Sequence, residues 1–255
     1  IKIFIFFEFI NDIKFFMKFS ILIPCRNETE IIEETITNIT NNLKNYNFEL
    51  LLINDFSTDN TLEKIKYFGS KFNNIKIFDN KKKGLGGSLN LGIDKAEGDY
   101  IVIYMADMSD DIDNLKEYFE ICKNNLNIDA VFGSRFIKDS KVVNYPKKKL
   151  FFNRIFNNLV KIIFFSNYND FTNAFKIYKR KTLKELMPIV SNHFNVFLEL
   201  PLKVILRNYT YKVIPISWKG RKIGVSKFKI KELSSMYLFT LIYCLIEKIF
   251  IKRNK

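Results

Sequence analysis

Short apolar segments alternate with amphipathic ones through the first half of the chain, and this alternation restricts the fold more than any other feature. Apolar runs typical of buried strands occupy 19–24, 48–53, 75–78, 100–105 and 130–133. The segments between them carry apolar residues at helical spacing, as in Ile32, Ile36 and Ile39. The pattern predicts an α/β fold, with a mostly parallel sheet and helices on both faces. Right-handed crossovers then place three strand-end loops at one edge of the sheet: 25–29, 54–60 and 106–111.

The second half of the chain is less regular and richer in aromatic residues. Further strands are expected over 175–178 and 211–216, and helices over 149–165 and 196–206. From 233 to 250 the pattern is apolar on nearly all sides, which predicts a C-terminal apolar helix. Neither an internal repeat nor a linker-like segment is visible, so one domain with a C-terminal appendage is predicted.

The two ends of the chain differ from the main domain, 17–230, in composition. Residues 1–16 are a tract of Ile, Phe and Lys. We interpret Met17 as the natural start, and the tract as either an upstream translation that is not native or a short apolar N-terminal extension. The tract is too short and too charged to span a bilayer, and it lacks the features of a signal peptide. Residues 231–255 are apolar and basic, and their apolar part is shorter than the roughly 20 residues that span a bilayer. We predict a helix at a membrane interface, with a core-packed or dimer-forming helix as the alternative.

The net charge of the chain is +14, which points to a polyanionic partner. Nucleic acid, an anionic membrane surface and phosphorylated substrates all fit such a charge. No segment resembles a nucleic-acid-binding module, so nucleic acid is not expected as a partner. The remaining options are a membrane surface and phosphorylated small molecules.

Cysteine and histidine usage excludes several kinds of site. The three cysteines are far apart and form no Cys-x-x-Cys spacing, which is typical of reduced thiols in a cytoplasmic protein. His193 is the single histidine, so a multi-histidine metal site is excluded. We expect a structural or surface role for His193, because no nucleophile pattern lies near it.

Three carboxylates follow the apolar run 100–105: Asp107, Asp110 and Asp111. Carboxylates at the end of a buried strand suit a divalent cation such as Mg²⁺ or Mn²⁺, held against the phosphates of a substrate. The alternative is a strand-to-helix turn in which an aspartate caps the helix that starts near Asp113. The local sequence leaves both interpretations open.

Polar loops after the other strands are candidates for binding a nucleotide and its phosphates. Asp55 and Asp59 follow the second strand, where a carboxylate can bind a uracil or ribose, or form an Asx turn and a helix cap. The loop 81–87 contains Lys83 and Gly84 beside a helix start, and its cations and amides can hold a phosphate. It matches neither a Walker motif nor the dinucleotide fingerprint.

Cations complete this set of residues. Arg135 follows the fifth strand, and Arg221 and Lys227 belong to a basic loop with glycines that could fold over phosphates. Each of them could equally be a solvated surface group. Their shared position after strands favours a role in binding.

The order and spacing of these segments resemble the family 2 glycosyltransferases over about residues 18–230. The segments that carry the resemblance are Ser20–Glu28, Asn54–Thr61, Gly84–Gly92, Gly98–Tyr100, Ala106–Asp107 and Val131–Arg135. In the second half, further segments are similar to the dolichyl- or polyprenyl-phosphate mannose and glucose synthases: Asp170–Lys176, Phe197–Glu199 and Arg221–Lys227.

The resemblance implies a nucleotide-diphospho-sugar fold of the glycosyltransferase A type, with a mostly parallel mixed sheet. It implies an inverting, metal-dependent enzyme of the cell envelope that moves a hexose from GDP-mannose or a UDP-sugar to a polyprenyl or dolichyl phosphate. Such an enzyme would act at the cytoplasmic face of the membrane as a peripheral protein, with residues 17–230 as its glycosyltransferase domain. Two alternatives stay open: transfer to a saccharide hydroxyl in surface polysaccharide synthesis, and a non-catalytic homologue that binds nucleotide sugars.

The resemblance also implies roles for individual residues. Asp107 would bind the metal with Ser109, and catalytic contacts to phosphates would come from Asp107, Arg135, Arg221 and Lys227. Substrate-binding roles are implied for Pro24, Arg26, Glu28, Asp55, Lys83, Gly84, Ala106, Asp110, Lys176 and Glu199. The chain departs from the family pattern at Asn54 and Met105, where the family usually has aspartates. A lipid phosphate acceptor needs no general base, whereas a hydroxyl acceptor would need one, and Asp110 or Asp111 is then the candidate.

Overall fold

The structure is a computed structural model that describes residues 16–220 and the backbone of 230–250, with side chains from 235 onward in the latter range. The expected N-terminal extension therefore lies, apart from Phe16, outside the described residues. The strands expected at 19–24, 48–53, 75–78, 100–105 and 130–133 are confirmed, although the fourth ends at Ile103. The proposed boundaries of the domain and its appendage remain predictions.

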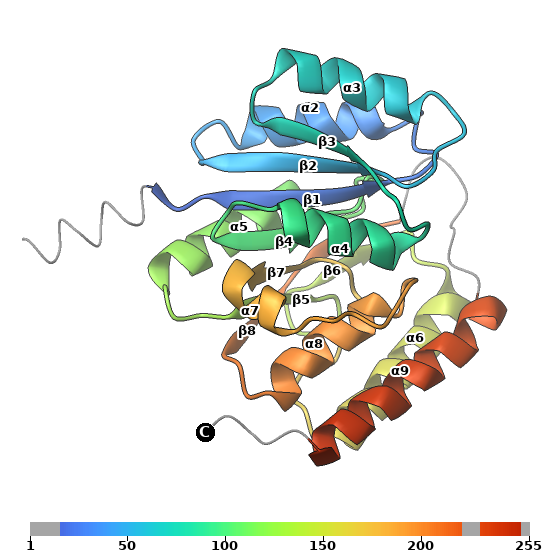
Figure 1. Cartoon of the computed structure of the whole chain (residues 1–255). Helices are drawn as coiled ribbons and strands as arrows, with labels where there is room; N and C mark the ends of the chain where they lie inside the picture. The colour runs from blue at the N-terminus through green and yellow to red at the C-terminus, as the bar shows by residue number, and fades with distance from the viewer. Residues whose placement is uncertain (1–15, 221–229, 251–255) are drawn as a thin grey trace, which may run out of the picture.

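Seven of the described strands form one mixed sheet in the order β3-β2-β1-β4-β7-β5-β8 (Figure 1). Their bounds are β1 (Phe19–Cys25), β2 (Phe48–Asn54), β3 (Ile75–Asp79), β4 (Tyr100–Ile103), β5 (Ala130–Ser134), β7 (Lys176–Lys179) and β8 (Tyr211–Pro215). All neighbouring pairs are parallel except those of β7, which is antiparallel to both β4 and β5. A second, two-stranded sheet pairs β6 (Lys141–Val143) with β9 (Ser217–Lys219).

Helices cover both faces of the large sheet, as predicted, because successive side chains of each strand point to opposite faces. On β1, Phe19, Ile21 and Ile23 belong to one core, whereas Leu22 belongs to the other. The first core is covered by α2 (Ile32–Asn42), α3 (Thr61–Lys71) and α5 (Ile112–Asn124). The second is covered by α4 (Leu85–Lys95), α6 (Lys147–Phe164), α7 (Arg180–Glu185), α8 (Val196–Leu206) and α9 (Ile230–Phe250).

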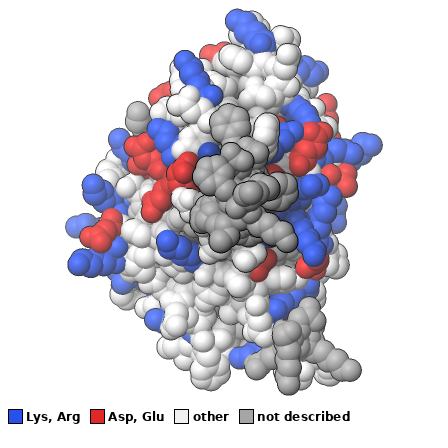
Figure 2. All heavy atoms as spheres, turned by 90° about the vertical axis from the view of Figure 1, so that its left-hand side faces the viewer, with Lys and Arg blue, Asp and Glu red and all other residues white. Residues whose placement is uncertain are grey.

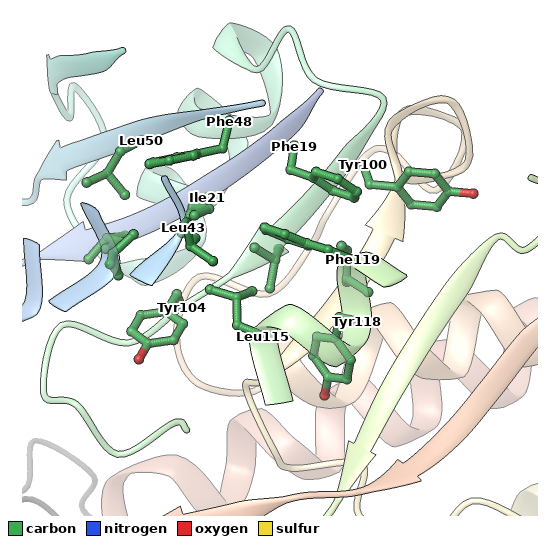
Figure 3. Close-up of a cluster of buried hydrophobic side chains, with 14 of the residues drawn as sticks. Phe19, Ile21, Leu43, Phe48, Leu50, Tyr100, Tyr104, Leu115, Tyr118 and Phe119 are labelled. Carbon is green, nitrogen blue, oxygen red and sulfur yellow. The ribbon is translucent and has the colours of Figure 1, made fainter. Parts of the chain in front are cut away.

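Aromatic rings pack closely in the first core (Figure 3). Phe19 of β1 stacks on Phe119 of α5 with ring centroids 3.8 Å apart, and the two rings lie between Tyr100 and Leu115. Such stacked and tilted aromatic pairs stabilise a core beyond the effect of their buried area. This packing fixes α5, and therefore the loop between β4 and α5, against the sheet.

The helices α6 and α9 lie side by side in Figure 1, and the ring of Phe156 on α6 meets Tyr237 on α9 edge to face. One side of α9 is buried in the second core through residues such as Leu241, while Leu238 and Phe239 are exposed. Across the described ranges, every helix falls short of the length and apolarity that a bilayer-crossing segment requires.

Basic and acidic side chains are mixed on the face of the molecule at the left of Figure 1, which Figure 2 turns toward the viewer. The amino ends of the parallel strands lie on this side. Glu49 of β2 is buried here, where its carboxylate accepts hydrogen bonds from Ser20 Oγ (2.7 Å) and from the Glu97 amide (2.7 Å). The ammonium groups of Lys76 and Lys18 lie 2.9 and 3.2 Å from its second oxygen. Burial alone would raise the pKa of Glu49, but these partners outweigh it and lower the pKa to about 2.

The stability of the fold should therefore fall in acid through Glu49. Its pKa in the folded state lies below the ordinary value of 4.5, so its contribution to the free energy of unfolding is complete above that pH and is lost as the pH falls toward about 2. Urea unfolding between pH 6 and pH 2, followed by circular dichroism, should show a shallower loss of stability for Glu49→Gln than for the wild type. Parallel curves for the two proteins would contradict this assignment.

Candidate active site

A cavity of about 780 Å³ lies at the carboxyl ends of the parallel strands. The three loops predicted to meet at one sheet edge do meet there, each contributing residues to its wall. The predicted site residues that line the cavity are Pro24, Arg26, Glu28, Asp55, Gly84, Asp107, Ser109, Asp110 and Arg135. Arg221 and Lys227 lie outside the described residues, so their predicted roles remain predictions.

Asp55 connects the loop after β2 to the start of α4. Its Oδ1 accepts hydrogen bonds from the Gly84 amide and from Asn80 Nδ2, both at 2.8 Å, and its Oδ2 lies 3.9 Å from the Arg26 guanidinium. Gly84 has φ of 116°, in the left-handed region, and a Cβ there would lie 2.9 Å from the carbonyl oxygen of Asn192. A glycine is therefore required at this position. Asp55 both lines the cavity and fixes the glycine-rich loop.

Asn54, where the family usually has an aspartate, is explained by its neighbour Asp79. The Asn54 amide donates to Asp79 Oδ1 (2.8 Å) and accepts from the Ser57 amide (3.2 Å). An aspartate at position 54 would place a second carboxylate against Asp79, and the two charges would repel. The asparagine at position 54 can donate a hydrogen bond to Asp79, which an ionised aspartate could not do.

The aspartates of the loop after β4 have different roles: one caps a helix, and two line the cavity. The sequence had left both roles open for this loop. Asp111 is the N-cap of α5, since its side chain accepts the Asp113 amide at 2.8 Å. Asp107 and Asp110 line the cavity instead. Asp107 accepts the Ser109 amide at 3.1 Å, and the buried Asp110 accepts the Met105 amide at 3.4 Å. Burial and the charge of Asp107 together raise the pKa of Asp110 to about 7.

This loop suits a cation that is also bound by oxygens of a substrate. Among the described residues, no group of three or more His, Cys, Asp and Glu side chains could hold a metal ion by itself. Mg²⁺ and similar cations are commonly bound by one or two carboxylates plus the oxygens of substrate phosphates. Asp107 on the cavity wall, with the Asp110 carboxyl beside it, fits that kind of site. Met105, in place of the usual aspartate, also lines the cavity but supplies no oxygen from its side chain.

Arg135 lines the cavity, but much of its guanidinium is used within the protein. Its Nε and Nη2 donate to the two oxygens of Asp170 at 2.8 and 2.7 Å, and its backbone amide donates to the same carboxylate at 2.9 Å. The rings of Phe136, Tyr145 and Trp218 lie 5.3, 5.6 and 5.7 Å from the guanidinium carbon. Burial would lower the pKa of Arg135, but Asp170 outweighs it and raises the pKa above its ordinary value. A phosphate could reach only the part of the guanidinium that Asp170 leaves accessible.

Four residues predicted to bind substrate are absent from the cavity wall: Lys83, Ala106, Lys176 and Glu199. Lys83 is an exposed side chain outside the cavity. Ala106 is buried, and its carbonyl oxygen accepts Thr35 Oγ1 at 2.7 Å. Lys176 is buried beside the carbonyl oxygens of Phe171 (3.1 Å) and Asn173, and burial lowers its pKa to about 7.

Glu199 is also directed away from the cavity. It is buried, and its carboxylate accepts the amides of Val190 (3.0 Å) and Ser191 (2.8 Å). The predicted direct contacts of these four residues with a substrate are therefore not supported by their positions. A sequence motif identifies a polar residue near the site. It does not show whether the side chain faces the cavity or is buried behind the cavity wall.

The sequence did not predict that one end of the cavity is lined by apolar side chains. They come from three helices of the second half and are Phe152, Phe156, Leu159, Phe197, Tyr237, Leu238 and Leu241. His193, for which a structural or surface role was expected, also lines the cavity, next to Phe194. The aromatic content of 149–165 was visible in the sequence, but the pairing of α6 with α9 that forms this wall was not.

Solved structures with the same fold support the architecture. Glucosyl-3-phosphoglycerate synthase from Mycobacterium tuberculosis in complex with phosphoglyceric acid matches with a TM-score of 0.70 at 16% identity, over 92% of this chain and 82% of that chain. A complex of the same enzyme with Mn²⁺, uridine diphosphate and glucosyl-3-phosphoglycerate also gives 0.70, at 16% identity, over 96% of this chain and 84% of that chain. These similarities confirm the predicted glycosyltransferase A type fold.

Sequence comparisons give the family. A dolichol-phosphate mannosyltransferase from Pyrococcus furiosus is 30% identical over 222 residues, which is 85% of this chain and 61% of that protein. Glycosyltransferase AglD from Haloferax volcanii is 26% identical over 79% of this chain and 33% of its own length. The chain thus spans less than two thirds of the length of these curated relatives. Residues 20–187 match the family described as Glycosyl transferase family 2, and the chain belongs to that family.

Proposed function

We propose that the protein transfers a hexose from a nucleotide-diphospho-sugar to a polyprenyl or dolichyl phosphate, with inversion at the anomeric carbon. One observation carries the proposal: a single cavity joins a polar wall around Asp107 and Asp55 to an apolar wall from α6, α8 and α9. A sugar nucleotide fits the polar end, and the chain of a lipid phosphate fits the apolar end. Membership of the glycosyltransferase family and the similarity to a dolichol-phosphate mannosyltransferase support this assignment.

The polar end is proposed to hold the donor. Asp55 and Arg26 line the wall next to the glycine-rich loop, where the nucleoside and its diphosphate would lie, and Glu28 lines the same cavity. Asp107, with Ser109 and Asp110 beside it, would hold a Mg²⁺ or Mn²⁺ ion together with the diphosphate oxygens. A neighbour with the same fold has been solved in complex with Mn²⁺ and uridine diphosphate, which supports the use of such a cation. When bound, the cation would neutralise the negative charge that develops on the leaving nucleoside diphosphate.

The acceptor would supply its own nucleophile. A phosphate oxygen of the lipid is already ionised near neutral pH, so it attacks the anomeric carbon without a general base. The new bond from carbon to the phosphate oxygen forms as the bond to the diphosphate breaks, which inverts the anomeric centre. The protein then needs only to orient the two substrates and to exclude water. Arg221 and Lys227 keep their proposed roles at the phosphates.

A membrane surface is the proposed partner of the apolar end. Large exposed apolar side chains gather on α6 and α9: Phe151, Phe152, Ile155, Leu159, Ile162, Leu238, Phe239, Ile242, Ile246, Ile249 and Phe250. Lysines occur near both ends of this surface, at Lys147, Lys148, Lys149, Lys161 and Lys248. Apolar helices flanked by lysines bind at the interface of anionic bilayers. We place the protein at the cytoplasmic face of the membrane as a peripheral protein, where the lipid phosphate can enter the cavity from the bilayer.

The test uses radiolabelled GDP-mannose and UDP-glucose with Mn²⁺, Mg²⁺ and polyprenyl phosphate in anionic vesicles. Label extracted into organic solvent is the expected result. Label in a water-soluble saccharide would show that the acceptor is a hydroxyl group and not a lipid phosphate. Binding of either donor without transfer or hydrolysis would show that the protein is a non-catalytic binder. If the protein neither binds nor transfers either nucleotide sugar, the proposal is rejected.

A pair of exposed residues tests the apolar end directly. Leu159 and Leu238 line the cavity and are 49% and 58% exposed, so glutamine at both positions should leave the fold intact. Losing their contacts with the lipid should lower kcat/KM for polyprenyl phosphate by about tenfold or more, with donor affinity unchanged. Phe72→Gln is the matched control, because Phe72 is exposed but lies away from the cavity. Equal effects of the control and the double variant would contradict the assignment.

A further inference from the structure

An ion pair is buried inside helix α8. Glu199 and Lys203 lie one turn apart, both side chains are fully buried, and their charged groups are 2.7 Å apart. Removing two charges from water costs several kcal/mol unless further hydrogen bonds satisfy them, so a buried pair depends on the polar groups around it. Those groups show what the pair does in this protein.

The further hydrogen-bond partners that the structure records for this pair are backbone groups of one short segment, 186–191. The Lys203 ammonium also lies 5.2 Å from the ring centroid of Tyr243 on α9. The Glu199 carboxylate accepts the Val190 and Ser191 amides, as described above. The Lys203 ammonium donates to the carbonyl oxygens of Leu186 (3.2 Å) and Pro188 (2.6 Å). The pair therefore fixes the backbone of this segment from both ends, and both of its side chains lie outside the cavity wall.

The continuation of the same segment forms a boundary of the donor end of the cavity. The carbonyl oxygen of Asn192 accepts the Gly86 amide at 3.0 Å. A Cβ on Gly86 would overlap the carbonyl oxygen of Ser191, so the segment and the first turn of α4 are in direct backbone contact. The next residue, His193, lines the cavity together with Gly84. A displacement of the segment would thus move both the histidine and the start of α4.

A third set of contacts shows that the segment has a fixed place. Asn195 Nδ2 donates to Ser191 Oγ and to Thr240 Oγ1 of α9, both at 2.9 Å, and all three side chains are buried. Buried and fully bonded polar networks favour one arrangement of the backbone over others. The segment is therefore held between α8, α9 and α4.

From these contacts we infer that Glu199 and Lys203 are positioning residues for the donor. They hold segment 186–193 against the glycine-rich start of α4, so that the Gly84 loop and His193 keep the geometry that binds the diphosphate. This inference rests on the proposed function for the identity of the donor. It replaces the direct substrate contact that the sequence motif implied for Glu199.

The experiment combines hydrogen–deuterium exchange with equilibrium binding of UDP and GDP in the presence of Mn²⁺. In Glu199→Gln, a neutral amide replaces the carboxylate that accepts two backbone amides. Exchange should rise about tenfold or more in both 186–193 and 84–88, because local opening becomes easier. Affinity for the nucleoside diphosphate should weaken by about tenfold, because the site loses its fixed geometry. The KM for the donor should rise, while the KM for the lipid phosphate should not change.

Glu49→Gln is the matched control, since it also neutralises a buried, ion-paired glutamate, but at the opposite edge of the sheet. It should lower stability without changing exchange at 84–88 or affinity for UDP and GDP. If Glu199→Gln fails to fold, the double variant Glu199→Gln with Lys203→Met removes both charges and avoids an unpaired buried ammonium. That double variant should show the same exchange and the same weakened affinity.

Two outcomes separate this inference from the proposed function. If Glu199→Gln or the double variant is destabilised but exchanges at 84–88 as slowly as the wild type, the positioning role is overturned. This result does not depend on what the protein binds. Absence of UDP and GDP binding by the wild type, with increased exchange in the variant, would reject the proposed donor but keep the role of the pair in holding the segment. Wild-type affinity in a variant with increased exchange would also overturn the inference.

Discussion

Replacement of Asp107 by asparagine is expected to lower the rate of sugar transfer by about 10²–10³-fold without unfolding the protein. Asp107 lines the polar end of the cavity, and it is not fully buried, so an amide of the same shape can be accommodated. The amide carries no charge to hold a cation against the diphosphate, and the leaving group would lose that stabilisation. Initial rates at saturating Mn²⁺, normalised to the folded fraction from circular dichroism, provide the measurement.

Asp111→Ala is the control for this prediction, because Asp111 belongs to the same acidic loop but caps α5. Losing the cap should cost about 1 kcal/mol of stability. The rate per folded molecule should stay at the wild-type value. A variant at position 107 that keeps more than a tenth of the wild-type rate would contradict the proposed cation site.

Replacement of Asp170 by asparagine is expected to lower the free energy of unfolding by about 3–5 kcal/mol. Asp170 is buried and holds Arg135 through two side-chain hydrogen bonds and one backbone hydrogen bond. The neutral amide would leave the guanidinium charged and buried without its counter-ion, because an arginine does not release its proton in proteins. Urea unfolding at neutral pH, followed by tryptophan fluorescence and circular dichroism, provides the measurement.

Asp113→Asn serves as the comparison, since Asp113 pairs with Lys116 at 3.0 Å on the surface of α5. An exposed ion pair of this kind contributes about 0–1 kcal/mol. Similar losses of stability in the two variants would show that Arg135 does not depend on the charge of Asp170. The stabilising role assigned to this buried ion pair would then be wrong.

The first half of the fold could be predicted from the sequence because its elements are local. Strand residues such as Leu22 and Ile23 enter different cores, and the alternation of strands with helices determines how they are covered. The loops at the carboxyl ends of parallel strands then have to meet. For this reason the positions of Asp55 and Asp107 on the cavity wall followed from the chain order.

Residues whose partners are distant in the sequence could not be placed in this way. Arg135 pairs with Asp170, 35 positions further along the chain. The local sequence around Arg135 does not indicate that its partner is an aspartate so far away. Lys176 and Glu199 belong to motifs of substrate-binding segments, yet both are bonded to backbone groups behind the wall. The apolar wall requires that α6 and α9 pack together, which no periodicity within either helix indicates.

The antiparallel strand β7 also has a consequence for the order in which the protein can fold. It supplies the only strand contact between β4 and β5 among the described strands, although it follows both of them in the chain. As the chain leaves the ribosome, β1 to β4 can pair early, but the part that carries Arg135 has no edge to join until residues 176–179 have emerged. Contacts of this sequence separation slow folding. The newly made chain therefore passes through a stage in which the edge of β4 is unpaired, and the two halves of the cavity come together only when β7 is inserted.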